Sequence, residues 1–188
     1  MKKSIGAKTL LFPTPVLIVC SYDEKGVPNA MNVAWGGIAS SEPPCVAISV
    51  REPRQTYANI LANKAFTVNI PSEKYMKEAD YFGIYSGKTE DKFKATGLTP
   101  VKSERVDAPY IKEFPLVLEC TLKETHKLGI HTQFIGEIKD VKVEESALNA
   151  KGFPDPALMK AFLFDPGTSA YYATGKFLGQ AFTIGKKK

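Results

Sequence analysis

The sequence lacks the patterns that mark several large function classes. It has no glycine-rich GxGxxG fingerprint, no P-loop, no HExxH pair and no GxSxG nucleophile elbow. It has no apolar run near the roughly 20 residues that cross a bilayer. Its longest candidate, Pro15–Val19, has only the length of a strand. These absences argue against a separate dinucleotide domain, a P-loop hydrolase, a zinc protease, an α/β-hydrolase and a membrane-spanning protein.

Histidine and cysteine are both scarce. The chain has two histidines, without metal-ligand spacing, and three cysteines, with no CxxC pair among them. Cys20, Cys45 and Cys120 each lie in an apolar, strand-like context, so we expect buried, reduced thiols and neither a disulfide framework nor a metal site. The N-terminus has lysines but no apolar signal-peptide core, which predicts a cytoplasmic protein.

The formal net charge of +5 comes from the ends of the chain. Five of the 25 basic residues are the terminal lysines, which leaves 20 basic against 20 acidic residues between them. A nucleic-acid-binding protein carries a basic stripe on its folded part. The balanced body therefore argues against a nucleic-acid partner, and we expect the lysines Lys2, Lys3, Lys186, Lys187 and Lys188 to aid solubility.

Strand-like segments dominate the rest, which predicts one mainly β domain over residues 1–188. Alternating runs at Leu116–Thr125 and Ile130–Val143 predict an antiparallel hairpin. Further strands are expected at 16–22, 29–39, 45–50, 66–70 and 170–173, and helices at 53–63, 72–81, 90–94 and 154–162. Many short strands with a few helices are typical of a closed or nearly closed β-barrel with peripheral helices.

The most informative stretch runs from Asn29 to Thr56. Its second half predicts a strand followed by a helix that opens at Pro53, a residue suited to a first helical turn. The free amides and dipole of a helix start favour an anion. Arg51 and Arg54 flank this start, and arginine forms forked contacts with phosphate oxygens. The alternative is a surface turn whose arginines pair with Glu52 or with solvent.

The first half of the stretch carries the only tryptophan, Trp35, followed by Gly36 and Gly37. Glycine lets another group approach a strand closely, so a flat ring could lie here. Asn29 and Asn32 would supply amides near the polar edge of that ring. The alternative is that Trp35 is a core residue. Together the two halves suit an aromatic ligand that bears a phosphate.

Three other segments could complete such a site, and each has a simpler alternative. Lys92, preceded by Ser86 and Gly87, could contact a phosphate or be a solvated lysine beside two acids. His131 opens a strand and is either a ligand contact or structural. Phe164 precedes an Asp-Pro-Gly turn and either covers a ligand or packs in the core.

The chain resembles the flavin reductase-like FMN-binding split-barrel family, and within it the flavoredoxins, over nearly its whole length. The order and spacing of several short segments carry the resemblance. These segments are KTLLFPTPVLIV, PNAMNVAWGG, PPCVAISVREPRQTYANI, DYFGIYSG, TEDKF, HTQFIGEI and YYATG.

The resemblance implies a six-stranded Greek-key split β-barrel that forms a homodimer and binds FMN noncovalently near the dimer interface. By this likeness Asn29, Asn32 and Trp35 lie along the isoalloxazine ring, although a backbone role is equally open for Asn32 and Ser86. The remaining implied contacts are Ser49, Arg51, Arg54 and Thr56 for phosphate and ribityl chain, Ser86, Gly87 and Lys92 for phosphate, and His131 and Phe164 at the border of the flavin.

Three functions follow as hypotheses. The first, by likeness to the flavoredoxins, is an FMN-binding electron carrier between redox proteins in anaerobic sulfur metabolism. The second is an NAD(P)H-dependent flavin reductase, because such enzymes bind nicotinamide against the flavin without a dinucleotide fingerprint. The third is a barrel that serves only as an interaction module, which would be colourless.

Overall fold

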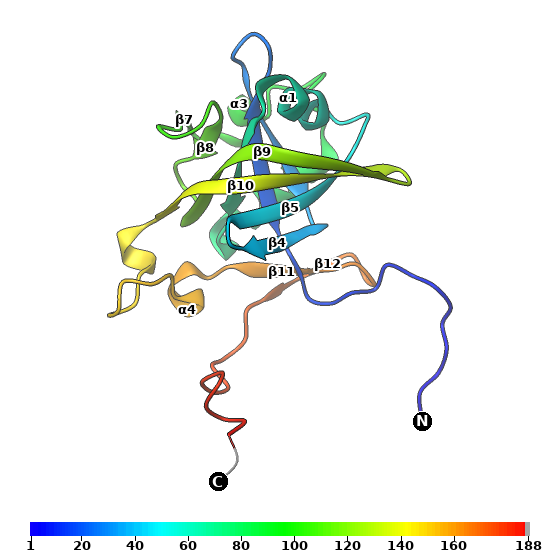
Figure 1. Ribbon diagram of the computed structural model, residues 1–188, viewed down its shortest axis with the longest axis vertical. Helices are drawn as coiled ribbons and strands as arrows, with labels where there is room; N and C mark the ends of the chain where they lie inside the picture. The colour runs from blue at the N-terminus through cyan, green and yellow to red at the C-terminus, as the bar shows by residue number, and fades with distance from the viewer. Residues whose placement is uncertain (187–188) are drawn as a thin grey trace.

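The computed structural model describes residues 1–186 and is dominated by one antiparallel sheet that curls into a barrel (Figure 1). Within these residues the sheet has seven strands in the order β3-β2-β6-β9-β10-β5-β4. Their bounds are β2 (Leu17–Tyr22), β3 (Pro28–Val33), β4 (Gly36–Ser41), β5 (Pro44–Arg51), β6 (Ala65–Ile70), β9 (Leu116–Leu128) and β10 (His131–Val143).

The two edge strands, β3 and β4, are consecutive in the chain. The chain leaves the sheet at Ala34–Trp35 and re-enters it at the opposite edge. At this crossing the Ser49 N–H of β5 donates a hydrogen bond of 2.8 Å to the Trp35 carbonyl. The crossing therefore brings the two edges of the sheet together beside Trp35.

Two smaller sheets flank the barrel. One joins β1 (Thr14–Pro15), β11 (Phe162–Asp165) and β12 (Ala170–Ala173), and the other pairs β7 (Pro100–Lys102) with β8 (Pro109–Ile111). The β7–β8 pair docks on β6 through two buried side chains. Thr67 donates a 2.6 Å hydrogen bond to the Pro109 carbonyl, and the Asn69 amide oxygen accepts one of 2.9 Å from the Ile111 N–H.

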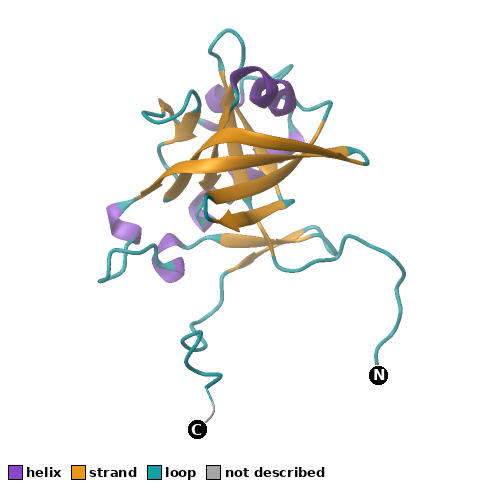
Figure 2. Cartoon of the chain, in the orientation of Figure 1, coloured by secondary structure: helices purple, strands orange, loops and turns teal. Residues whose placement is uncertain are grey.

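The helices are short and lie at the barrel surface (Figure 2). Asp91 caps the third helix, since its carboxylate accepts from the Lys94 N–H at 3.1 Å, and Gly97 ends that helix with a positive φ of 70°. No helix of residues 1–186 is both long and apolar enough to cross a membrane. The helical segments are α1 (Gln55–Asn63), α2 (Met76–Ile84), α3 (Lys92–Thr96), α4 (Pro156–Met159) and the 3-10 turns Glu73–Tyr75 and Glu145–Ala147.

Strand β2 is buried on both faces, which explains its continuous apolar run. One face packs inside the barrel with Phe66 and Phe134, and the other packs under α2 and α3 with Phe82 and Phe93. Inside the barrel, Gly136 gives room to Phe66, because a β-carbon there would overlap the ring. The three cysteines are buried and free, as expected.

The structure confirms some sequence-based boundaries and corrects others. The long hairpin is present as β9 and β10, and the strand Ala170–Ala173 is present as expected. The expected strand Asn29–Ala39 is wrong, because the crossing at Trp35 divides it into β3 and β4. That division also accounts for seven strands where the resemblance implies six. The helix expected from Pro53 begins at Gln55, because Glu52 and Pro53 form a turn.

Candidate functional site

Four adjoining cavities follow β3, the start of α1 and the 85–91 loop, and each shares lining residues with the next. The first, the apolar cavity, measures about 380 Å³ and is lined by Thr9, Leu11, Trp35, Ser49, Leu128, His131 and Gln133. The second, the strand-end cavity, measures about 160 Å³ and is lined by Met31, Asn32, Val33, Ala34, Trp35, Ser49, Arg51, Arg54 and His131.

The other two cavities lie beyond Arg54. The third, the cation cavity, is a narrow space of about 10 Å³ lined by Asn29, Met31, Arg54, Gln55, Thr56, Tyr85, Ser86, Gly87 and Lys92. The fourth, the loop cavity, measures about 380 Å³ and is lined by Asp23, Val27, Pro28, Asn29, Gln55, Gly87, Lys88, Thr89, Glu90, Asp91 and Lys92. Shared lining residues thus connect the four cavities in a row, which we call the groove.

Lys92 is the most unusual residue of the groove, because its charge is buried and has no carboxylate partner among residues 1–186. The side chain is 4% exposed, and its ammonium donates only two long hydrogen bonds of 3.4 Å, to the carbonyls of Phe82 and Tyr85. Burial lowers the pKa of Lys92 from 10.5 to about 8, and the positive charge of Arg54 acts in the same direction. The alternative that Lys92 is a solvated surface lysine is therefore wrong.

Asn29 and Thr56 form a buried pair on the wall of the cation cavity. The Asn29 amide donates a 2.8 Å hydrogen bond to the Thr56 hydroxyl, which the first turn of α1 places there. The other amide atom, Asn29 Oδ1, is buried and has no hydrogen-bond partner in the part of the chain that the structure describes. Gly87 lies against this oxygen so closely that a β-carbon would overlap it. Among the described residues, this oxygen therefore has no hydrogen-bond partner and lies beside a glycine whose β-carbon would displace it.

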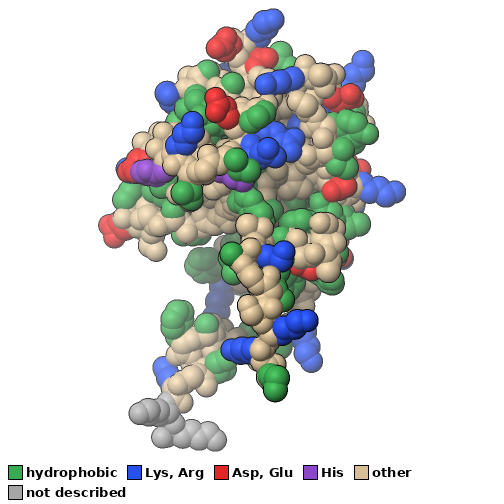
Figure 3. All heavy atoms as spheres, turned by 90° about the vertical axis from the view of Figure 1, so that its right-hand side faces the viewer, with side chains coloured by type: hydrophobic (Ala, Val, Ile, Leu, Met, Phe, Trp, Pro, Cys, Tyr) green, Lys and Arg blue, Asp and Glu red, His purple; other side chains and the backbone are tan. Residues whose placement is uncertain are grey.

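The turn between β5 and α1 presents two arginines. Arg51 ends β5 and is exposed, and Arg54 is half-buried between the strand-end and cation cavities. Within residues 1–186 neither side chain is in a salt bridge or hydrogen bond, so the expected alternative pairing with Glu52 is absent there. Figure 3 shows Lys and Arg side chains gathered beside the histidines on this face.

The 85–91 loop supplies the opposite wall. The Ser86 carbonyl accepts hydrogen bonds from the Thr89 and Glu90 N–H groups at 3.2 and 3.1 Å, which folds the loop tightly. Within the described residues, the N–H groups of Ser86 and Gly87 donate no hydrogen bond. Among the described residues, the loop thus leaves two backbone donors without an acceptor, on residues that line the same cavity as Arg54 and Lys92.

Trp35 forms the boundary between the apolar and strand-end cavities. The two glycines after it differ in role. A β-carbon on Gly36 would lie 2.7 Å from Leu17 Cδ1 and 2.9 Å from the Ala47 carbonyl oxygen, so this glycine serves internal packing. Gly37 is exposed and has open space around it. The close approach that the sequence predicted is therefore to the barrel's own atoms at Gly36.

The remaining candidates divide into two groups. Ser49 and His131 line both the apolar and the strand-end cavity, and His131 pairs with Arg51 in the β10–β5 register. Asn32 lines the strand-end cavity, but its amide donates at 3.0 Å to the Ala79 carbonyl and so ties β3 to α2. Phe164 lies apart from the groove, on β11, where its ring packs against Tyr171 at 5.7 Å.

Several groove residues were not singled out by sequence reasoning. Gln55, Lys88 and Thr89 line the loop cavity; Gln55 and Lys88 adjoin residues that were chosen, and Thr89 is two positions from Gly87. Their closeness in the sequence to Arg54 and Gly87 was the one sign that could have identified them as site residues. Leu11 and Leu128 line the apolar cavity from the N-terminal segment and the β9–β10 turn. Nothing local in the sequence joins those two segments.

Comparison with known proteins gives consistent matches. The model of a flavin reductase-like domain matches residues 9–176. The flavoredoxin of Desulfovibrio vulgaris (Miyazaki F) superposes with a TM-score of 0.95 and 51% identity, covering 99% of this chain and 100% of that chain. Flavoredoxin from Methanosarcina acetivorans gives a TM-score of 0.92 and 31% identity, over 99% and 98% of the two chains.

A sequence relative agrees with these matches. A protein of Archaeoglobus fulgidus is 33% identical over 131 residues, which are 70% of this chain and 73% of its own length. The expected fold class, a mainly β split barrel with peripheral helices, is confirmed by the matched family and structures. The resemblance to flavoredoxins is confirmed as well.

Proposed function

The chain belongs to the family of flavin reductase-like domains, and we propose that it holds FMN noncovalently in the groove and carries electrons between protein partners. The family binds flavins, and both structures described above are flavoredoxins. The proposal concerns this chain's own cofactor, its role as a carrier and the residues that hold the flavin.

The observation that carries the proposal is the buried ammonium of Lys92. A buried charge without a partner is costly, and Arg54 adds a second positive charge nearby. Such a site is stabilised by a bound anion, and a phosphate dianion accepts several charge-assisted hydrogen bonds at once. Besides Lys92 and Arg54, the donors that surround the same space are the Thr56 hydroxyl and the free N–H groups of Ser86 and Gly87.

The ring of FMN would lie at the other end of the groove. Trp35, Ser49 and His131 line two cavities that continue from Arg54, and the apolar cavity suits a flat aromatic system. Arg51 lies between the two ends and would contact the phosphate or ribityl chain. Asn29 would border the phosphate, while Asn32 would position β3 through its bond to α2.

The protein's part in electron transfer follows from these positions. FMN supplies the redox chemistry when bound. Lys92, Arg54 and Thr56 would fix the phosphate and so set affinity. Trp35 would exclude water from the ring, and a His131 ring N–H facing the flavin would stabilise negative charge there.

We also propose partners and a setting. Apolar side chains on the N-terminal segment and the β9–β10 turn are exposed beside the apolar cavity, which supports a homodimer that covers the flavin. Likeness to flavoredoxins supports redox proteins as donor and acceptor, in anaerobic sulfur metabolism. The three free cysteines are in keeping with a cytoplasmic location.

The test begins with colour. The purified protein should be yellow, with flavin absorbance that survives dialysis, and extraction should release FMN. A colourless protein that takes up no added FMN would overturn the proposal and leave the interaction-module hypothesis.

One observation favours a second function, an NAD(P)H-dependent flavin reductase. The apolar cavity of about 380 Å³ beside Trp35 has room for another planar group in addition to part of a flavin. Anaerobic mixing with NADH or NADPH separates the two functions. An electron carrier should keep its flavin absorbance over many minutes, whereas rapid bleaching with turnover would show a reductase.

A further inference from the structure

The cation cavity is narrower than the phosphate group proposed to bind there. It measures about 10 Å³, which is on the order of the room that one water molecule needs. A phosphate group, with its phosphorus and four oxygens, is several times larger. Thr56 and Lys92 both line this narrow space. The hydroxyl and the ammonium can therefore contact a phosphate only if one wall of the cavity moves aside.

The walls of the cation cavity differ in how they are held. Asn29 and Met31 belong to β3, and Thr56 in the first turn of α1 is joined to Asn29 by the 2.8 Å hydrogen bond. The wall opposite them is the 85–91 loop. Among residues 1–186, no hydrogen bond or salt bridge joins this loop to β3 or α1. The loop is therefore the wall that is able to move.

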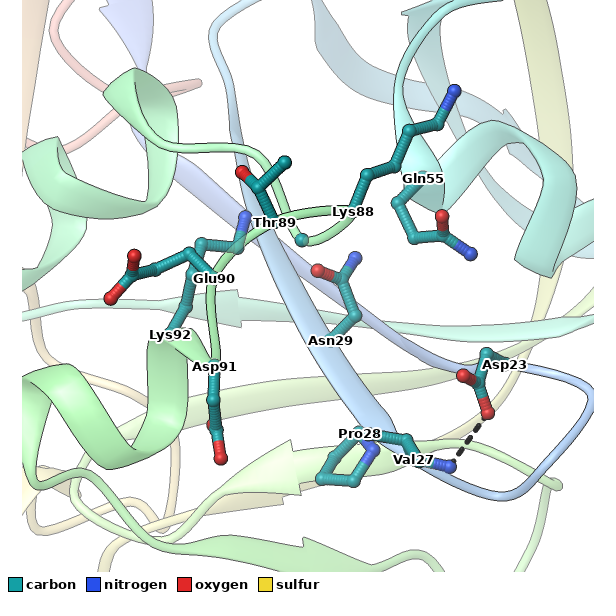
Figure 4. Close-up of a pocket in the computed structure, with 11 residues that line it drawn as sticks. Asp23, Val27, Pro28, Asn29, Gln55, Lys88, Thr89, Glu90, Asp91 and Lys92 are labelled. Carbon is teal, nitrogen blue, oxygen red and sulfur yellow. Dashed lines mark hydrogen bonds between the residues drawn. The ribbon is translucent and has the colours of Figure 1, made fainter.

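The loop lies closed on β3 through a packing contact at Gly87. A β-carbon on Gly87 would overlap Asn29 Oδ1 and would lie 3.6 Å from the Gln55 β-carbon. Figure 4 shows the Asn29 side chain pointing from β3 toward the loop, with Gln55 of α1 beside it. Because Asn29 Oδ1 is buried and has no partner in the described part of the chain, closure of the loop over this oxygen costs free energy. Opening the loop would expose the oxygen to water.

The two ends of the loop are suited to act as hinges. Tyr85 follows the last residue of α2, and Asp91 caps α3, so the loop runs from one helix end to another. Such positions commonly absorb hinge motions. One tether crosses the loop, since the Tyr81 hydroxyl of α2 donates a 3.0 Å hydrogen bond to Glu90. A second is the long 3.4 Å hydrogen bond from the Lys92 ammonium to the Tyr85 carbonyl.

We propose that the 85–91 loop is a phosphate latch, which opens to admit the phosphate of FMN and then closes on it. This inference rests on the proposed function, which places the phosphate in the cation cavity. In the closed position the N–H groups of Ser86 and Gly87 and the Lys92 ammonium donate to the phosphate. FMN therefore enters and leaves at the rate at which the loop opens. Riboflavin has no phosphate, occupies only the ring end of the groove and does not require the latch to open.

Rapid mixing of the apoprotein with each flavin tests the latch, with the change in flavin fluorescence as the signal. The observed rate of FMN binding should level off as the FMN concentration rises, because loop opening becomes the limiting step. The observed rate for riboflavin should rise in proportion to its concentration over the same range. The comparison isolates the phosphate, since the ring is the same in both flavins.

Tyr81→Phe tests which segment moves. The variant keeps the ring, which lies 4.3 Å from the Tyr85 ring, and removes the hydrogen bond to Glu90. The limiting rate of FMN binding and the release rate of bound FMN should both rise about two- to tenfold, because opening breaks one hydrogen bond fewer. The rates for riboflavin should not change. Tyr172→Phe, at a 48% exposed tyrosine of β12 outside the four cavities, is the matched control and should change none of these rates.

Each result supports or overturns the latch. A limiting rate that is seen with FMN alone and that Tyr81→Phe raises supports it. A linear dependence for FMN, the same limiting rate for riboflavin, or an FMN limit that Tyr81→Phe leaves unchanged overturns the inference, while the proposed function stands. If riboflavin binds too weakly to follow, the effect of Tyr81→Phe on FMN decides. If no flavin binds at all, the proposed function fails and the inference falls with it.

Discussion

At the scale of single residues, Lys92 is expected to strengthen FMN binding while it lowers the free energy of unfolding of the apoprotein. Its folded-state pKa of about 8 lies below 10.5, so burial of the ammonium costs the free protein stability at neutral pH. Lys92→Met should raise the free energy of unfolding of the apoprotein by on the order of 3 kcal/mol at pH 7. The same change should weaken FMN binding by about 1–3 kcal/mol, because the phosphate loses a charge-assisted contact.

Thermal unfolding of the apoprotein and FMN titration measure these opposite effects. Lys94→Met alters an exposed lysine on the same helix and should change neither quantity. A Lys92→Met protein that binds FMN as tightly as the parent would contradict the phosphate assignment.

Titration of Lys92 also predicts a pH dependence of FMN affinity. Below about pH 8 the free protein carries the ammonium, and above it the proton is lost. Because phosphate binds the charged form, the FMN dissociation constant should be flat from pH 7 to 8. It should then rise by at most about tenfold per pH unit. Stability of the apoprotein should change in the opposite sense, increasing between pH 8 and 10.5 as the unfolded chain alone keeps the proton. Lys92→Met should remove both trends.

At Gly87, the space available for a side chain should decide how tightly the protein binds FMN. A β-carbon would overlap Asn29 Oδ1, so Gly87→Ala must displace either the Asn29 amide or the 85–91 loop. We expect FMN affinity to fall at least about tenfold with a small change in melting temperature, measured by titration and calorimetry. Gly37→Ala, where open space surrounds the glycine, is the matched control. Equal FMN affinity in all three proteins would show that the loop does not form the phosphate wall.

At the scale of elements, Asn69 joins three strands and sets the docking of β7–β8. It is fully buried, donates at 3.0 Å to the Ile18 carbonyl of β2 and accepts from Ile111 of β8. Asn69→Ala leaves those backbone groups unsatisfied and should lower the free energy of unfolding by about 2–4 kcal/mol in urea denaturation. FMN affinity should stay unchanged, since Asn69 lies outside the four cavities. A loss of FMN affinity at a temperature where the variant is still folded would show that docking of the β7–β8 pair helps to shape the groove.

Elements with a strong local pattern could be predicted, and those fixed by distant contacts could not. The β9–β10 hairpin follows from alternation and a tight turn, both of which are local. No local sequence pattern indicates the break between β3 and β4 at Trp35. The break arises where the sheet closes and the Ser49 N–H donates a hydrogen bond to the Trp35 carbonyl. Likewise, β1 pairs with β11 through Thr14 and Phe164, 150 residues apart.

At the scale of the whole molecule, the groove residues could be chosen from the sequence, but their environment could not. Arg54, Thr56 and Lys92 were selected for chemistry that suits phosphate, and folding brings them to one cavity. The burial of Lys92 depends on how α2 and α3 pack over β2, which no local pattern contains. Phe164 lies outside the groove of a single chain, so its predicted flavin contact would need the second subunit.

The proposed homodimer is the prediction that belongs to the whole molecule. The segments before β1 and from β12 to residue 186 extend from the barrel (Figure 1), and Leu11 and Leu128 are 77% and 78% exposed beside the apolar cavity. Apolar side chains so placed are expected to be covered by a second copy. Sedimentation should therefore give twice the chain mass, and Leu128→Asp should shift it toward the monomer, because a buried carboxylate without a partner is costly.

The same substitution should act on the cofactor. If the second subunit covers the ring end of the groove, Leu128→Asp should also weaken FMN binding, and the loss should diminish as protein concentration rises and restores the dimer. Leu158→Asp, on α4 and away from the groove, offers a matched exposed leucine that should leave mass and affinity unchanged. A parent protein that sediments as a monomer with full FMN affinity would show that one chain forms the complete site.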